Sequence, residues 1–108
     1  MDRINRVSIV GMGAMGILYG DFFANALGRE QVTFLADSDR ARRYRNTPVY
    51  CNGRKMDFRI QDGAVPDSQG PAQLLLFAVK ATALGDAISV AGNQVGKDTV
   101  ILSVLNGI

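Results

Sequence analysis

Short apolar segments alternate along the chain with segments whose apolar residues recur at helical spacing. The apolar segments are rich in β-forming residues and predict buried strands, at 6–10, 31–36, 73–79 and 98–105. The segments between them predict helices, at 14–27, at 38–46 and after Thr82. This alternation of strands and helices is typical of an α/β fold with a mainly parallel sheet and helices on its faces.

The first two helices carry further signals. The apolar side expected for the helix at 14–27 consists of Ile17, Leu18, Phe22, Ala26 and Leu27. The helix at 38–46 has Ser38 or Asp39 as its expected N-cap, because both side chains can accept a hydrogen bond from the first turn. It is expected to end before Pro48.

Residues 49–60 predict an inserted β-hairpin that turns at Asn52-Gly53, since both turn positions tolerate a positive φ. A two-residue turn pairs Cys51 with Arg54. That register places five apolar residues on one face, namely Val49, Cys51, Met56, Phe58 and Ile60. Residues 61–71 then read as a polar loop.

Composition narrows the class of protein. A chain of 108 residues with 47% apolar and 20% charged residues suits one packed domain. It has no histidine and a single cysteine, Cys51, which excludes histidine-based catalytic triads, an internal disulfide and a His- or Cys-rich metal site. We therefore expect no metal and a reducing, cytoplasmic location. The longest purely apolar run, 74–79, is far short of the ~20 residues that a membrane-spanning helix needs.

A glycine motif directly follows the first predicted strand and opens the first helix. It reads G-x-G-x-x-G and consists of Gly11, Met12, Gly13, Ala14, Met15 and Gly16. In a strand–turn–helix context the first glycine allows the turn, the second lets the backbone approach a pyrophosphate, and the third lets the helix pack closely. The helix N-terminus adds free N–H groups and a positive dipole end. We expect a dinucleotide here, in a Rossmann-type, doubly wound domain; a glycine-rich turn without a ligand is the alternative.

The residues after the second strand bear on the choice of dinucleotide. Asp37 lies 21 residues after Gly16, where an acid accepts hydrogen bonds from ribose hydroxyls and favours NAD. Four arginines follow, and Arg40 is the one expected to reach the 2′-phosphate of NADP. Segment 37–59 carries seven basic and three acidic residues. Nucleic acid is not expected, because few aromatic residues accompany these charges and the net charge is only +2.

Two further polar residues follow predicted strands at the same sheet edge. Lys80 follows the most apolar strand, where it could present a cation to a cofactor ribose or an acidic substrate, or simply be solvated. Asn106 follows the last strand as Asn106-Gly107, a pair that is also common in plain turns.

The glycine motif, Val79-Lys80-Ala81 and Asn106-Gly107, in this order, resemble the N-terminal domain of the ketopantoate reductase (2-dehydropantoate 2-reductase) family. The resemblance implies that residues 11–16 hold the pyrophosphate and that Lys80 lies near the nicotinamide riboside. It also implies that Asn106 contacts the cofactor ribose and the substrate as a supporting catalytic residue. Family members usually carry an arginine for the NADP phosphate where this chain has Asp37, so the resemblance implies NADP while Asp37 keeps NAD open.

The family also has a helical C-terminal substrate domain that supplies the general acid. Residues 1–108 are therefore expected to be the dinucleotide-binding domain of a two-domain protein, inactive alone and truncated before that domain. The implied reaction is reduction of a branched 2-keto acid, 2-dehydropantoate to pantoate in the pantothenate pathway. The alternatives are a non-catalytic NAD(P)-sensing module, or the same domain of a 3-hydroxyacid or glycerol-3-phosphate dehydrogenase. An apolar rim left by the truncation also predicts self-association, with a homodimer as its simplest form.

Overall fold

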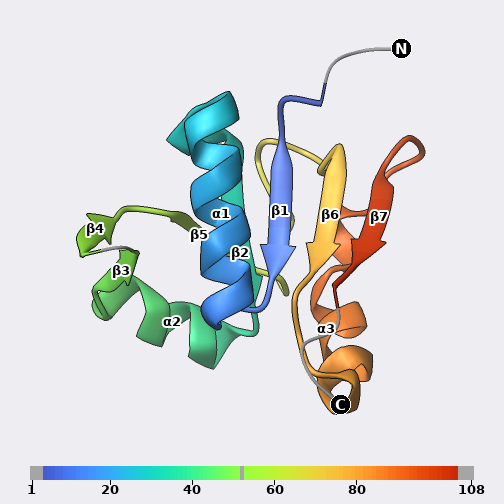
Figure 1. Cartoon of the computed structure of the whole chain (residues 1–108). Coiled ribbons are helices and arrows are strands. Elements are labelled where there is room, and N and C mark those ends of the chain that lie inside the picture. Colours follow the sequence, from blue (N-terminus) through green and yellow to red (C-terminus); the bar gives the residue numbers. More distant parts are fainter. Residues whose placement is uncertain (1–3, 52, 105–108) are drawn as a thin grey trace.

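The main sheet is parallel throughout. The structure, a computed structural model, describes residues 4–51 and 53–104. The sheet has the order β5-β2-β1-β6-β7 (Figure 1). Its strands are β1 (Val7–Val10), β2 (Val32–Ala36), β5 (Arg59–Asp62), β6 (Leu74–Phe77) and β7 (Val100–Ser103). All four neighbouring pairs run parallel, which confirms the predicted Rossmann-like α/β fold. The strand order reverses between β1 and β6, and ligands bind at such switch points in open parallel sheets.

Helices cover both faces of this sheet (Figure 1). They are α1 (Ala14–Leu27), α2 (Ser38–Asn46) and α3 (Leu84–Val90), with short 3₁₀ turns at η1 (Arg29–Gln31), η2 (Ala81–Ala83) and η3 (Gly92–Gln94). On the face of α1, the core contains Val7, Ile9 and Phe34. On the face of α3, Leu75 and Phe77 pack with helical alanines. The alternation along each strand separates these two cores.

The apolar side predicted for α1 was wrong in most positions. Leu18 and Phe22 are 55% and 63% exposed. The residues of α1 that pack on the sheet core are instead Met15, Tyr19, Phe23, Ala24 and Leu27, of which only Leu27 was expected. Close packing of the glycines explains the difference. Gly16 and Gly20 are the buried residues of α1, and a Cβ at Gly20 would lie 2.8 Å from the Phe34 ring. The helix therefore approaches the sheet on its glycine side.

The hairpin is shorter than predicted. β3 (Val49–Cys51) and β4 (Arg54–Met56) pair antiparallel in the predicted register, with Cys51 opposite Arg54. Gly53 has φ +78°, and Asn52 lies outside the described residues. Beyond Met56 the prediction was wrong, because residues 59–62 pair in parallel with β2 as edge strand β5. This arrangement pairs the free edge of β2 and lets Phe58 pack against Phe34, with ring centroids 4.7 Å apart.

A polar network covers the sheet where α3 does not reach. Arg59 holds the carboxylate of Asp67 through both oxygens, at 2.7 and 2.9 Å. Arg59 also donates to the Thr33 hydroxyl at 2.8 Å. Gln94 joins Asp67 to the buried Ser8, at 2.7 and 2.8 Å. The hydrogen bonds from Arg59 hold the pKa of Asp67 at about 2. This network therefore ties the polar loop after β5 to the middle of the sheet.

Within residues 4–51 and 53–104, no helix is long and apolar enough to cross a membrane. Over the same residues, no three potential metal ligands of the His, Cys, Asp or Glu type gather in one place.

Candidate functional site at the carboxyl edge of the sheet

The predicted site residues that the structure describes lie at one edge of the sheet. The parallel strands all end there (Figure 1). The glycine turn 11–16 links β1 to α1, Asp37 follows β2, and Lys80 follows β6. Asn106, the supporting catalytic residue of the sequence prediction, lies outside the described residues.

Two of the three motif glycines are required by the packing of the chain itself. Gly11 has φ +112°, and a Cβ there would lie 2.2 Å from the Ala78 carbonyl oxygen. A Cβ on Gly16 would lie 1.8 Å from the Gly11 carbonyl oxygen. Both positions therefore need glycine to form the turn and to bring the helix against it, whether or not a ligand binds.

Gly13 is different, because none of the contacts among residues 4–51 and 53–104 requires a glycine there. A Cβ on Gly13 would meet no atom within 4 Å. Its φ of −84° is ordinary for any residue, and it is the N-cap of α1 without a side-chain capping hydrogen bond. The N–H groups that begin a helix have no partner within the helix. The turn thus leaves open space beside uncapped N–H groups, which suits an approaching anion.

The other three residues of the motif have separate positions. Ala14 is exposed and is the first residue of α1, while Met15 packs against the core. Met12 lines a hollow of about 310 Å³ between α2 and the hairpin, together with Tyr44 and Met56. The two methionine side chains are therefore directed toward the hollow and the core, and the backbone N–H groups of the turn remain the polar groups available to a ligand.

A cleft of about 320 Å³ lies at the switch point, between the glycine turn, the end of β2 and α3. Val10, Leu35 and Ala87 give it an apolar floor. The charged residues that line it are Asp37, Arg40 and Asp86. The cleft brings Gly11, Asp37 and Arg40 together as the sequence predicts. Asp86 was not predicted as a site residue, because an acid in the first turn of a helix is often simply solvated.

Asp37 caps α2, so the expected caps Ser38 and Asp39 were wrong. The Asp37 Oδ1 accepts a hydrogen bond from the Arg40 backbone N–H at 2.8 Å, and its Oδ2 lies 3.7 Å from the Arg40 Nε. Asp39 instead pairs with Arg42, at 3.6 Å. An N-cap lies just before the first helical residue, and Ser38 is already the first residue of α2, so Asp37 is the N-cap. Asp37 and Arg40 thus contact each other at the mouth of the cleft.

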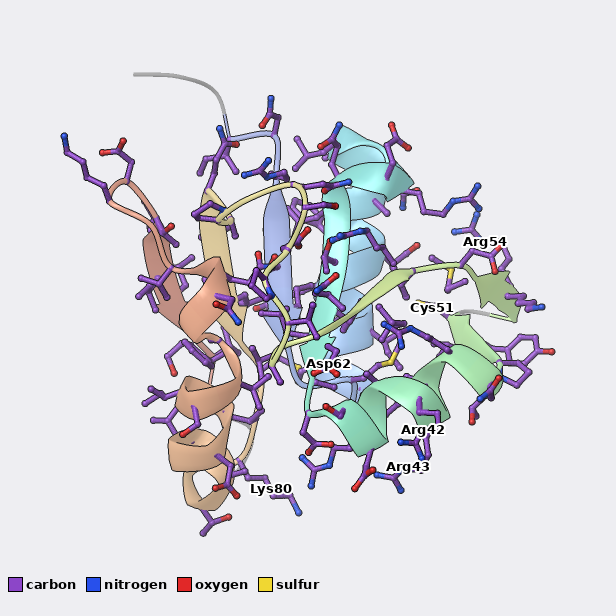
Figure 2. All side chains as sticks on the ribbon, turned by 180° about the vertical axis from the view of Figure 1, so that it is seen from behind. Arg42, Arg43, Cys51, Arg54, Asp62 and Lys80 are labelled. Atoms are coloured by element: carbon purple, nitrogen blue, oxygen red, sulfur yellow. The ribbon has the colours of Figure 1, made fainter. Side chains whose placement is uncertain are left out.

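Asp62, at the end of β5, is a residue of this edge that the sequence did not indicate. Its Oδ2 accepts a hydrogen bond from the Ser38 hydroxyl at 2.6 Å. Its Oδ1 accepts from the Ala64 N–H at 2.9 Å. These bonds, led by that of Ser38, lower the pKa of Asp62. Figure 2 shows Asp62 beside the start of α2. Its segment was predicted as a loop, so nothing in the sequence placed it beside Ser38.

Lys80 is exposed just after β6 (Figure 2). Its backbone carbonyl accepts a hydrogen bond from the Ala83 N–H at 2.9 Å, which starts the turn into α3. Over the part of the chain that the structure describes, its ammonium makes no hydrogen bond or ion pair. The side chain is therefore free to meet an anion at this edge.

Comparison with known families decides what this arrangement belongs to. The family model described as ketopantoate reductase PanE/ApbA matches residues 7–108. The chain belongs to this family. A comparison with curated proteins gives no match.

Solved structures of ketopantoate reductases share the fold. One, provisionally assigned as a ketopantoate reductase of Ralstonia solanacearum MolK2, is 24% identical with a TM-score of 0.74. The 2-dehydropantoate 2-reductase of Geobacter metallireducens GS-15 is 26% identical with a TM-score of 0.67. A ternary structure of D-mandelate dehydrogenase with NADH and anilino(oxo)acetate is 21% identical with a TM-score of 0.73. They cover 98%, 95% and 95% of this chain, which spans 33%, 34% and 34% of theirs.

Proposed function

We propose that this chain is the dinucleotide-binding domain of a ketopantoate reductase-like oxidoreductase that reduces a branched 2-keto acid to its 2-hydroxy acid. Membership of the family and the switch-point cleft support this proposal. The chain spans only a third of the solved relatives, so the substrate domain and the general acid are proposed to lie outside these residues.

The open space at Gly13 carries the proposal. Gly11 and Gly16 are explained by contacts within the chain, whereas Gly13 leaves room that the described residues do not fill. A diphosphate fits this room, because phosphate oxygens accept from the free N–H groups of the first turn and its charge is stabilised by the helix dipole. The residues present therefore fit a dinucleotide.

Each part of the edge then has a task. The turn would hold the diphosphate, the apolar floor of the cleft would accept the adenosine, and Asp37 would accept hydrogen bonds from its ribose hydroxyls. Bound nicotinamide would supply the hydride for reduction of a ketone. Lys80 adds positive charge at the end of β6, where an acidic substrate would approach, and Asn106 is proposed from the family resemblance to hold the ribose and the substrate.

A titration of the full-length protein with NADH and NADPH, followed by a panel of 2-keto acids, tests this function. The panel contains 2-dehydropantoate and an aryl 2-keto acid, since one structural relative is a mandelate dehydrogenase. We expect Lys80→Ala to lower kcat/KM by at least about tenfold, the loss of one charge-assisted contact to the cofactor ribose or the acidic substrate. Lys97→Ala is the matched control, because Lys97 lies at a separate hollow formed with Ile4 and Pro71.

The results of these assays distinguish the candidate functions. Reduction of 2-dehydropantoate that depends on Lys80 supports the proposal. Binding of a dinucleotide without reduction of any keto acid would favour a nucleotide-sensing module, and turnover of 3-hydroxyacids or glycerol 3-phosphate would favour a neighbouring dehydrogenase class. Absence of dinucleotide binding would refute all of these.

A further inference from the structure

The adenosine end of the cleft bears on which nicotinamide nucleotide is used. NADP differs from NAD by a phosphate on the adenosine 2′-hydroxyl. An acid at the end of the second strand accepts from free ribose hydroxyls, whereas a 2′-phosphate needs cations and hydroxyl donors around it. The family resemblance alone implies NADP, so the local geometry has to be weighed against it.

The donors that could bind a 2′-phosphate are already used by carboxylates. Arg40 contacts Asp37 through both its backbone N–H, at 2.8 Å, and its Nε, at 3.7 Å. The Ser38 hydroxyl donates to Asp62 at 2.6 Å. A phosphate that recruited the Ser38 hydroxyl would have to break its bond to Asp62. A phosphate that recruited the Arg40 guanidinium would lie beside the Asp37 carboxylate, because the Asp37 Oδ2 is 3.7 Å from the Arg40 Nε. The first arrangement loses a hydrogen bond, and the second adds repulsion between the phosphate and the carboxylate.

The charges of the residues that line the cleft also disfavour a 2′-phosphate. Among its described lining residues, Arg40 is the one cation, and two acids, Asp37 and Asp86, line the same cleft. Arg43 lies outside this cleft. It lines a shallow hollow of about 480 Å³ on the first turn of α2 together with Arg40 and Ser38, and the two carboxylates of Asp37 and Asp39 line the same hollow. Arg43 extends from α2 in Figure 2. A phosphate held by Arg43 would therefore still lie next to carboxylates.

We infer that this site selects NAD(H) over NADP(H), with Asp37 rejecting the 2′-phosphate and Asp62 acting as a positioning residue that holds the Ser38 hydroxyl away from it. This inference rests on the proposed function, because it assumes that the cleft takes a nicotinamide dinucleotide. It assigns a role to Asp62 and to the cap of α2 that the strand-end position of Asp37 alone does not provide.

Direct binding measurements test the inference without relying on turnover. Dissociation constants of NADH and NADPH are measured for the full-length protein by calorimetry, and those of 5′-AMP and 2′,5′-ADP are measured as fragments of the adenosine end. We expect the wild-type protein to bind NADH at least about tenfold more tightly than NADPH, given the cost of placing like charges together.

Three variants separate selection from a structural role. Asp37→Asn keeps an oxygen that can cap α2 and is expected to narrow the preference by at least about tenfold, by improving NADPH affinity. Asp62→Ala frees the Ser38 hydroxyl and is expected to improve NADPH affinity by about threefold to tenfold while NADH affinity stays the same. Asp98→Asn is the matched control, an acid that lies with Lys97 at a separate hollow away from the cleft, and it should leave the ratio within about twofold.

Failure of this inference can be distinguished from failure of the proposed function. Tighter binding of NADPH than NADH by the wild-type protein would overturn the inference and leave the proposed function intact. An unchanged ratio in Asp37→Asn, or a loss of both nucleotides in Asp62→Ala, would also overturn it, because a structural role affects both nucleotides equally. If neither nucleotide binds, the proposed function fails first.

Discussion

Replacement of Gly13 by serine separates ligand binding from folding. The new Cβ meets no atom within 4 Å in the part of the chain that the structure describes, and the backbone at residue 13 already has an ordinary φ of −84°. Serine is a better N-cap than glycine by a few tenths of a kcal/mol. Its hydroxyl can accept from the N–H groups that are uncapped in α1. The variant should therefore fold with unchanged or slightly higher stability.

The same change should severely weaken dinucleotide binding. The serine oxygen would occupy the N–H groups that the diphosphate needs, and its Cβ would fill the room next to them. Loss of one or two charge-assisted hydrogen bonds, about 1.5–3 kcal/mol each, corresponds to an affinity loss of roughly tenfold to roughly twenty-thousandfold.

Thermal unfolding and calorimetric titration with NADH measure the two quantities on the same protein samples. Gly92→Ser is the matched control, because a Cβ on Gly92 also meets no atom within 4 Å and Gly92 does not line the cleft. We expect the control to change neither melting temperature nor affinity. If Gly13→Ser binds NADH as tightly as the wild-type protein, the diphosphate does not lie in the turn and the reasoning is wrong.

Two further predictions concern stability. Gly16→Ala places a Cβ 1.8 Å from the Gly11 carbonyl oxygen. The free energy of unfolding, measured by urea denaturation, should therefore fall by at least about 2 kcal/mol. An unchanged free energy of unfolding would contradict the close packing of this turn. Because Arg59 holds the pKa of Asp67 at about 2, below its ordinary 3.8, this carboxylate should stabilise the fold above about pH 4 and lose its effect as the pH falls toward 2. Asp67→Asn should then cost on the order of 2 kcal/mol at pH 7 and flatten that acid dependence; equal pH profiles for the two proteins would refute it.

The sequence predicts the main elements because their signals are local. The glycine turn and the helix after it agree with the structure at Ala14–Leu27. The register of the hairpin strands agrees as well, with Cys51 opposite Arg54, as a two-residue turn predicts. The side of α1 that packs on the sheet was missed because apolar periodicity counts large side chains, whereas here the two glycines set the contact.

The missed parts of the site depend on contacts between distant residues. Ile60 continues the alternation of the hairpin and also suits an edge strand, and only the free edge of β2 decides between them. Asp62 consequently reaches Ser38, which is 24 residues away in sequence. The capping role of Asp37 was missed because three neighbouring residues at 37–39 can each cap a helix, and sequence alone does not choose among them.

A crystal structure of the full-length protein with NADH bound tests the central claim most directly. We predict diphosphate oxygens within hydrogen-bond distance, about 2.7–3.2 Å, of backbone N–H groups between Gly13 and Gly16, in the space that no side chain fills. A bound dinucleotide whose diphosphate lies elsewhere, with this turn left empty, would contradict the account.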